Sequence, residues 1–196
     1  MARPDNPPEA TAYSVPPVTG WLLAGGEGRR MNGRDKGLVP YHGRPLATWV
    51  LDTLIPQTAA VQISANRHLD QYAALLRAGR IRHGCPAGHA DVWPDDVDLP
   101  PRSGPLAGFI TAMRHTQTDW LMLLPCDTPH LPNDLVARML AAALESGAQV
   151  VVPCSGVGSE QHYHWVCALL NKRENPEVER AFVKGERKVS RIIQSL

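Results

Sequence analysis

The sequence lacks the features that define several protein classes. It has only four cysteines and no CxxC pair, which argues against a disulfide framework or a zinc site and is typical of a reducing compartment. Neither charge dominates, because 20 Lys and Arg stand against 19 Asp and Glu, so any anion site must be local. No apolar run approaches the roughly 18 residues of a spanning helix, and the first 17 residues have no apolar signal core. We therefore expect a cytoplasmic protein that binds neither nucleic acid nor membrane.

Proline is over-represented, at 18 of 196 residues. Five prolines fall in the first 17 residues among small and polar neighbours, which predicts a disordered, proline-rich tail over residues 1–17. A second proline-rich stretch, 85–105, is expected to be a loop. Hydrophobic residues make up 43% of the chain, enough for one core, so residues 18–196 are expected to form a single domain.

Apolar runs of strand length alternate with helical periodicity from residue 18 onward. The predicted strands cover 19–24, 59–64, 120–124, 149–153 and 163–170, and the predicted helices cover 46–55, 69–76, 105–115, 134–146 and 176–196. This order predicts an α/β fold with three α/β/α layers and a Rossmann-like, mostly parallel sheet. Ligands of such sheets bind at the carboxyl ends of the strands, where candidate residues should gather.

A glycine-rich stretch within residues 23–37 follows the first predicted strand. Glycines let backbone N–H groups approach an anion, and four cations come within eight residues: Arg29, Arg30, Arg34 and Lys36. The pattern favours a polyphosphate, with a solvated turn as the alternative. A Rossmann fingerprint fails because the third position counted from Gly26 is Met31, and a Walker loop fails because Arg34 and Asp35 follow Gly33.

An acidic residue, Asp127, follows the apolar run 120–124 within the motif PCDTP. At the carboxyl end of a strand it would face the same edge as the glycines. A carboxylate facing phosphates needs a bridging hard cation, which suggests Mg²⁺. The alternative is that Asp127 caps the next turn.

Weaker signals lie in three other places. Asn66 follows the second predicted strand and either contacts a base or ends the strand. Asp95 and Asp96 lie in the proline-rich loop, where either one offers hydrogen-bond acceptors to a guanine edge or both are solvated. His162 and His164 lack a third metal ligand at suitable spacing, and Cys126 lacks the neighbouring base of a catalytic thiol.

Taken together, these motifs resemble one family. They are 23–37 (LAGGEGRRMNGRDKG), 64–67 (SANR), 104–108 (GPLAG), 125–132 (PCDTPHLP) and 185–189 (GERKV). The chain is similar to molybdenum cofactor guanylyltransferases of the molybdopterin-guanine dinucleotide biosynthesis protein A type, within the nucleotidyltransferase superfamily. The resemblance implies a nucleotide-diphospho-sugar transferase fold. It also implies Mg²⁺-dependent transfer of GMP from GTP to the phosphate of molybdopterin, releasing pyrophosphate.

The resemblance assigns roles to individual residues. Leu23, Ala24, Gly25 and Gly26 would hold the nucleotide, Lys36 would contact its phosphates, and Arg30 would neutralise the triphosphate. Asn66, with Ser64 as the other alignment, would belong to the same binding site. Asp95 would face guanine, Asp127 would bind Mg²⁺, and the part around Arg187 and Lys188 would face the pterin.

Two departures from the family keep alternatives open. The family continues beyond the 185–189 motif into a further strand and helix, which we expect to be absent here. The loop 85–101 is longer than usual, so Asp95 and Asp96 both stay candidates for reading guanine. The alternative functions are transfer to another phosphorylated acceptor and non-catalytic binding of GTP or cofactor. Expected partners are GTP and molybdopterin, with other molybdenum cofactor biosynthesis proteins and target molybdoenzymes.

Overall fold

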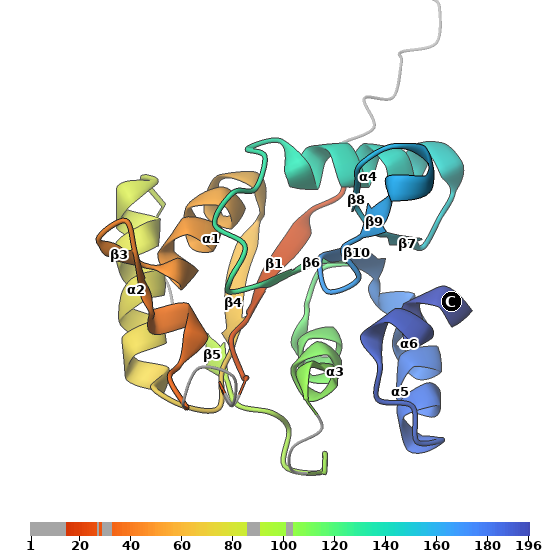
Figure 1. Cartoon of the computed structure of the whole chain (residues 1–196), viewed down its shortest axis with the longest axis horizontal. Helices are drawn as coiled ribbons and strands as arrows, with labels where there is room; N and C mark the ends of the chain where they lie inside the picture. Colours follow the sequence, from red (N-terminus) through yellow and green to blue (C-terminus); the bar gives the residue numbers. More distant parts are fainter. Residues whose placement is uncertain (1–14, 27, 29–32, 86–90, 101–103) are drawn as a thin grey trace, which may run out of the picture.

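A six-stranded sheet forms the centre of the molecule, in the order β5-β4-β1-β6-β10-β7 (Figure 1). The computed structural model describes residues 15–26, 28, 33–85, 91–100 and 104–196. The strands are β1 (Val18–Leu23), β4 (Ala60–Ser64), β5 (Val92–Trp93), β6 (Trp120–Pro125), β7 (Val150–Val151) and β10 (Ala168–Asn171). β5, β4, β1 and β6 pair in parallel, and β10 is antiparallel to β6 and β7. The predicted mostly parallel sheet is confirmed.

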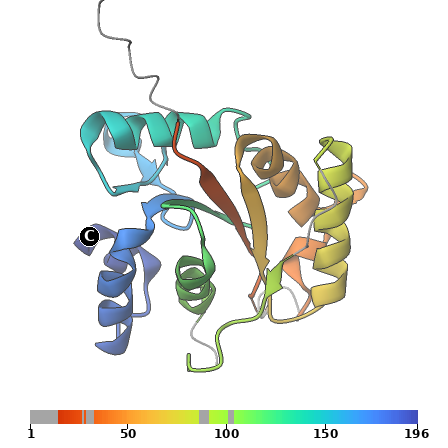
Figure 2. The same cartoon turned by 180° about the vertical axis from the view of Figure 1, so that it is seen from behind.

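Helices cover both faces of this sheet, as the two opposite views show (Figures 1 and 2). α1 (Leu46–Leu54), α2 (Leu69–Arg82) and α4 (Leu135–Ser146) contribute to one hydrophobic cluster. α3 (Pro105–His115), α5 (Asn175–Val183) and α6 (Val189–Ser195) contribute to the other. Within β1, Leu22 belongs to the first cluster and Trp21 and Leu23 to the second. A strand covered on both faces reads as a continuous apolar run, which explains the sequence pattern.

Short elements complete the described chain. Two small antiparallel pairs are β2 (Pro40–Tyr41) with β3 (Arg44–Pro45), and β8 (Cys154–Ser155) with β9 (His162–Tyr163). Single 3₁₀ turns occur at η2 (Lys36–Leu38), η3 (Ile55–Gln57), η4 (Gly158–Glu160) and η5 (Lys172–Glu174). Within the described ranges no helix is both long and apolar enough to cross a membrane.

Three expected elements differ from the structure. The helix expected over 176–196 is divided into α5 and α6, with Gly185 at a φ of 98° between them. The strand expected over 163–170 is interrupted by a turn in which Cys167 N donates to His164 O at 2.8 Å, so β9 and β10 lie in different sheets. The apolar residues inside that turn hide it from periodicity. The expected loop 85–105 contains β5, whose two residues pair with β4.

Close packing brings α3 to the carboxyl end of β4. A Cβ at Gly108 would lie 2.6 Å from Ser64 Oγ, so only glycine allows this approach. The start of α3 therefore borders the edge where the candidate site lies. The boundary between a tail over 1–17 and a domain over 18–196 stays a prediction, because most of the tail lies outside the described residues.

Candidate active site

The carboxyl ends of four parallel strands meet at one edge of the sheet. In the strand register Leu23 of β1 lies opposite both Ser64 of β4 and Pro125 of β6, and Ser64 lies opposite Trp93 of β5. The segments that leave these strands carry every strand-end motif found in the sequence. Parallel pairing therefore brings together residues that lie far apart in the chain.

One side of this edge carries a polar cluster formed by Gly25, Asn66 and Asp95. Asn66 Nδ2 donates to Asp95 Oδ2 at 2.8 Å, and Asp95 N donates to Asn66 Oδ1 at 2.9 Å. Asn66 Nδ2 also lies 3.4 Å from Gly25 O, and a Cβ at Gly25 would lie 3.0 Å from Asn66 Nδ2. Burial raises the pKa of Asp95, and the negative charge of Asp96 adds to this, while the Asn66 bond opposes it. Of the three residues predicted here, Asn66 contacts both Gly25 and Asp95.

Asp96 points to different partners from those of its neighbour. His115 Nε2 lies 2.9 Å from Asp96 Oδ1, and Arg114 Nη1 lies 3.0 Å from Asp96 Oδ2. The Asp96 N–H donates to Thr111 Oγ1 at 3.1 Å. Asp96 thus ties the loop to α3, whereas Asp95 faces Gly25.

On the other side of the edge, Lys36 forms an ion pair with Asp127. Lys36 Nζ donates to Asp127 Oδ2, and the two side chains are 49% and 31% exposed. The hydrogen bond shown for this carboxylate goes to Lys36, which argues against a turn cap as its only role. The sequence analysis predicts that Lys36 contacts phosphate and that Asp127 binds Mg²⁺, and the structure brings the two side chains into contact.

The remaining predicted residues are two buried side chains, one glycine and one residue outside the described part. Leu23 and Ala24 are buried, and Ala24 N donates to Ser64 O at 2.7 Å, so their side chains belong to the core. Among the described residues, apart from its chain neighbours, none lies within 4 Å of the position of a Cβ on Gly26. Arg30 lies outside the described residues.

Cys126 precedes Asp127 and is buried. Burial raises the pKa of its thiol to about 12, and the charges of Asp127 and Asp35 add to the effect. The thiolate form is therefore negligible at neutral pH, which removes Cys126 as a nucleophile.

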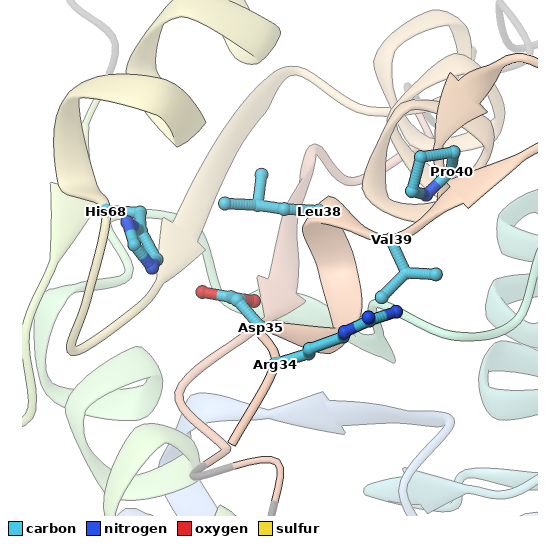
Figure 3. Close-up of a pocket in the computed structure, with 6 residues that line it drawn as sticks. All are labelled: Arg34, Asp35, Leu38, Val39, Pro40 and His68. Carbon is cyan, nitrogen blue, oxygen red and sulfur yellow. The ribbon is translucent and has the colours of Figure 1, made fainter. Parts of the chain in front are cut away.

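Two pockets are lined in part by segments that follow the parallel strands. A pocket of about 330 Å³ lies behind the Lys36 segment, and Figure 3 shows its lining of Arg34, Asp35, Leu38, Val39, Pro40 and His68. A second, of about 280 Å³, includes Arg187, the residue expected on the pterin side, whose guanidinium carbon lies 4.2 Å from the centre of the Phe182 ring. The first pocket is lined by neither Asp95 nor Asp127, but it includes Asp35, the chain neighbour of Lys36.

A fit test for Mg²⁺ rests on the donors present. Asp127 supplies one carboxylate, and the described residues contain no group of three or more His, Cys, Asp or Glu able to hold a metal ion. Mg²⁺ in phosphate sites uses one or two carboxylates together with phosphate oxygens and water. The donor set fits a magnesium ion shared with a bound nucleotide and does not fit an all-protein cage.

Comparison with known proteins identifies the family. The model for the MobA-like NTP transferase domain matches residues 20–196. The chain belongs to this family. The resemblance found in the sequence motifs is thereby confirmed.

Relatives with curated names agree with this assignment. A molybdenum cofactor guanylyltransferase of Acidovorax sp. (strain JS42) is 42% identical over 144 residues, covering 74% of this chain and 61% of that protein. One from Aliivibrio fischeri (strain MJ11) is 34% identical over 175 residues, covering 89% and 79%. The chain thus spans about three fifths of the length of the Acidovorax relative.

Solved structures show the same fold. Molybdopterin-guanine dinucleotide biosynthesis protein A from Archaeoglobus fulgidus superposes with a TM-score of 0.63 at 21% identity, covering 91% of this chain and 80% of that one. The 2-C-methyl-D-erythritol 4-phosphate cytidylyltransferase of Thermus thermophilus gives 0.63 at 15% identity, covering 89% and 82%. The predicted nucleotide-diphospho-sugar transferase fold is confirmed.

Two residues at the strand-end site were missed by the sequence analysis. Arg67 donates to two carbonyl oxygens of the glycine-rich stretch, and Tyr72 donates to Asp35 beside Lys36. Arg67 is present in the motif SANR, so its position next to Asn66 was a usable signal. Tyr72 fits the apolar periodicity of a helix, and that pattern carries no sign of a polar contact.

Proposed function

We propose that this protein transfers GMP from GTP to the terminal phosphate of molybdopterin and releases pyrophosphate. One observation carries the proposal: the carboxyl edge of the sheet holds two different pairs of polar residues. Asp95 and Asn66 lie beside Gly25 on one side, and Lys36 and Asp127 pair on the other. The curated name shared by relatives 34–42% identical to this chain supports the same reaction.

The Asp95 side suits a guanine base. Guanine presents two neighbouring N–H donors, N1–H and N2–H, and a carboxylate offers two acceptor oxygens to such a pair. Asn66 holds one of these oxygens and thereby orients the carboxylate. Because Asp96 is engaged by Arg114 and His115, Asp95 is the better candidate for reading guanine.

The Lys36 side suits a triphosphate. The ammonium of Lys36 and the carboxylate of Asp127 form an ion pair. A bound nucleotide would draw Lys36 to its phosphate oxygens, and Asp127 would then face those oxygens together with Mg²⁺. When bound, Mg²⁺ would offset negative charge on the phosphates as pyrophosphate departs. Arg30 keeps its predicted role in neutralising the triphosphate.

The proposed reaction requires positioning rather than a base. An acceptor phosphate is already ionised at neutral pH, so its oxygen attacks the α-phosphorus of GTP while the bond to the leaving pyrophosphate breaks. Lys36 would hold the triphosphate, and Asp95 with Asn66 would orient the nucleoside. Catalysis by orientation and charge neutralisation agrees with the protonated state of Cys126.

A second candidate is nucleotidyl transfer to another phosphorylated acceptor. The TM-scores against the Archaeoglobus protein and the Thermus cytidylyltransferase are both 0.63. The fold therefore does not distinguish which base is used or which phosphate accepts the nucleotide, and this second candidate stays open. A non-catalytic GTP-binding role stays the third alternative. Cytoplasmic location and partners among cofactor biosynthesis proteins and molybdoenzymes stay predictions from the sequence.

The test is pyrophosphate release from GTP, ATP, CTP and UTP, each with and without molybdopterin and with Mg²⁺. We expect release only from GTP and only with molybdopterin. Release with CTP and a sugar or alcohol phosphate would favour the second candidate. GTP binding without pyrophosphate release under any condition would favour the third.

A further inference from the structure

The connection between β4 and α2 reaches three parts of the site. Asn66 holds Asp95, Arg67 contacts the glycine-rich stretch, and Tyr72, in the first turn of α2, contacts Asp35. We propose that Arg67 and Tyr72 are positioning residues that hold the glycine-rich stretch and Lys36 in their nucleotide-binding geometry before the nucleotide arrives. The proposal rests on the function proposed above for the same site.

Arg67 joins two points of the glycine-rich stretch, Gly26 and Gly33. Its Nη2 donates to Gly26 O at 3.1 Å, and its Nη1 donates to Gly33 O at 2.9 Å. Gly33 N in turn donates to Gly28 O at 3.0 Å. A planar guanidinium presents its donors in a fixed fork, so these bonds set the separation of the two carbonyls.

The orientation of the Gly33 carbonyl has a consequence for the adjoining peptide. In a planar trans peptide the N–H points opposite to the carbonyl, so the N–H of Arg34 faces away from Arg67. Both bonds from Arg67 go to neutral carbonyls, which leave its charge in place at the base of the stretch. A polyphosphate that binds on the side opposite to Arg67 would therefore meet a backbone donor that is already oriented.

Tyr72 anchors the segment that carries Lys36. Its ring is fully buried, and its hydroxyl donates to Asp35 Oδ1 at 2.5 Å. The other oxygen, Asp35 Oδ2, is buried and has no hydrogen-bond partner among the described residues. Loss of the Tyr72 hydroxyl would therefore leave this carboxylate with neither of its oxygens bonded by a described side chain. On the other side of Lys36, a Cβ at Gly37 would overlap the same hydroxyl. Lys36 is thus held between two neighbours that both pack on Tyr72.

The rival interpretation is that Arg67 contacts phosphates directly and positions nothing. The two interpretations differ in the absence of nucleotide. A positioning bond constrains the ligand-free protein, whereas a phosphate contact forms only in the complex. Amide hydrogen exchange of the nucleotide-free protein therefore separates them, and it does so whether or not the protein turns over GTP.

The experiment compares Arg67→Met and Tyr72→Phe with the wild-type chain, using Arg77→Met as a matched control on the exposed part of α2. Exchange is measured by mass spectrometry on peptides covering residues 24–39. We expect about 10- to 100-fold faster exchange there in Arg67→Met and in Tyr72→Phe, in proportion to the loss of a hydrogen bond to a charged group. Arg77→Met should match the wild type.

GTP affinity is then measured in the same variants by calorimetry. Both positioning variants should bind GTP more weakly while their preference for GTP over ATP is unchanged, because Asp95 and Asn66 are intact. Unchanged ligand-free exchange in both variants would overturn the proposal. Unchanged exchange with weakened GTP binding in Arg67→Met would also overturn it and make Arg67 a phosphate contact. Faster exchange in a chain that turns over no nucleotide would refute the proposed function alone.

Discussion

At the scale of single residues, Lys36 and Asp127 form an ion pair between segments 91 residues apart. Both side chains are partly exposed, so the pair adds little to stability. Lys36→Ala should therefore barely change the melting temperature. It should weaken GTP binding about 10- to 150-fold, because a hydrogen bond from a charged donor is lost. Calorimetry and thermal unfolding test the two effects, and an unchanged dissociation constant would remove Lys36 from phosphate binding.

Asp95 and Asp96 are adjacent in sequence but differ in partners. Asp95→Asn replaces one acceptor with a donor facing guanine, so the preference for GTP over ATP should shrink while triphosphate contacts persist. Asp96→Asn should instead lower stability by about 1 kcal/mol, since it weakens the bonds to Arg114 and His115. Base preference is measured by competition binding and stability by urea unfolding. If Asp96→Asn alone lost base preference, the assignment would be reversed.

The sequence predicted those site residues that have a functional side chain or a glycine directly after a strand. Asp127 and the glycines follow apolar runs, and Asn66 follows a strand. The sequence left the choice between Asp95 and Asp96 open. That choice depends on the contacts of Asp96 with Arg114 and His115 of α3, which lie 18 and 19 residues away in the chain. The Tyr72 contact spans 37 residues and joins a helix to a turn, which no local pattern encodes.

At the scale of elements, glycines with similar sequence surroundings have different roles. A Cβ at Gly37 would overlap the buried Tyr72 hydroxyl and lie 3.2 Å from Cys126 Cβ. One at Gly26 would meet no atom within 4 Å in the part of the chain that the structure describes, chain neighbours aside. Gly37→Ala should lower stability by about 1–3 kcal/mol, or the melting temperature by roughly 2–10 °C. Gly26→Ala should leave the melting temperature unchanged.

Gly26 and Gly37 should also differ in how a methyl group at each position affects nucleotide binding. Gly26→Ala should weaken GTP binding, because its methyl group would fill space that no described residue beyond its chain neighbours occupies and that a ligand would use. Thermal unfolding and calorimetry on both variants provide the measurement. Equal stability of Gly37→Ala and the wild type would contradict the packing of the Lys36 segment on Tyr72.

Elements buried on both faces were easiest to predict. β6 is an apolar run as far as Leu124, and β1 ends in the apolar residues Trp21, Leu22 and Leu23. The division of 163–170 between two sheets was not predicted, since the turn residues Trp165 and Val166 are as apolar as the strand. β5 has only two residues, too few for hydrophobic periodicity to mark it.

At the scale of the whole molecule, two hydrophobic clusters support one sheet, and its carboxyl edge gathers the site. Asp127 tests whether that edge performs chemistry. Asp127→Asn keeps size and hydrogen bonding but removes the charge that would hold Mg²⁺. It should abolish pyrophosphate release at saturating GTP, an effect on kcat, while the protein stays folded. Near-normal release by the folded variant would leave Asp127 with a structural role only.

Transfer of a labelled nucleotide tests the central claim most directly. The wild-type protein is incubated with Mg²⁺, molybdopterin and GTP carrying a radioactive phosphorus in either the α or the γ position. The account predicts that the α label moves to molybdopterin as GMP and that the γ label is released as pyrophosphate. Retention of the α label on a guanosine diphosphate, with the γ label released as orthophosphate, would show hydrolysis instead and contradict nucleotidyl transfer.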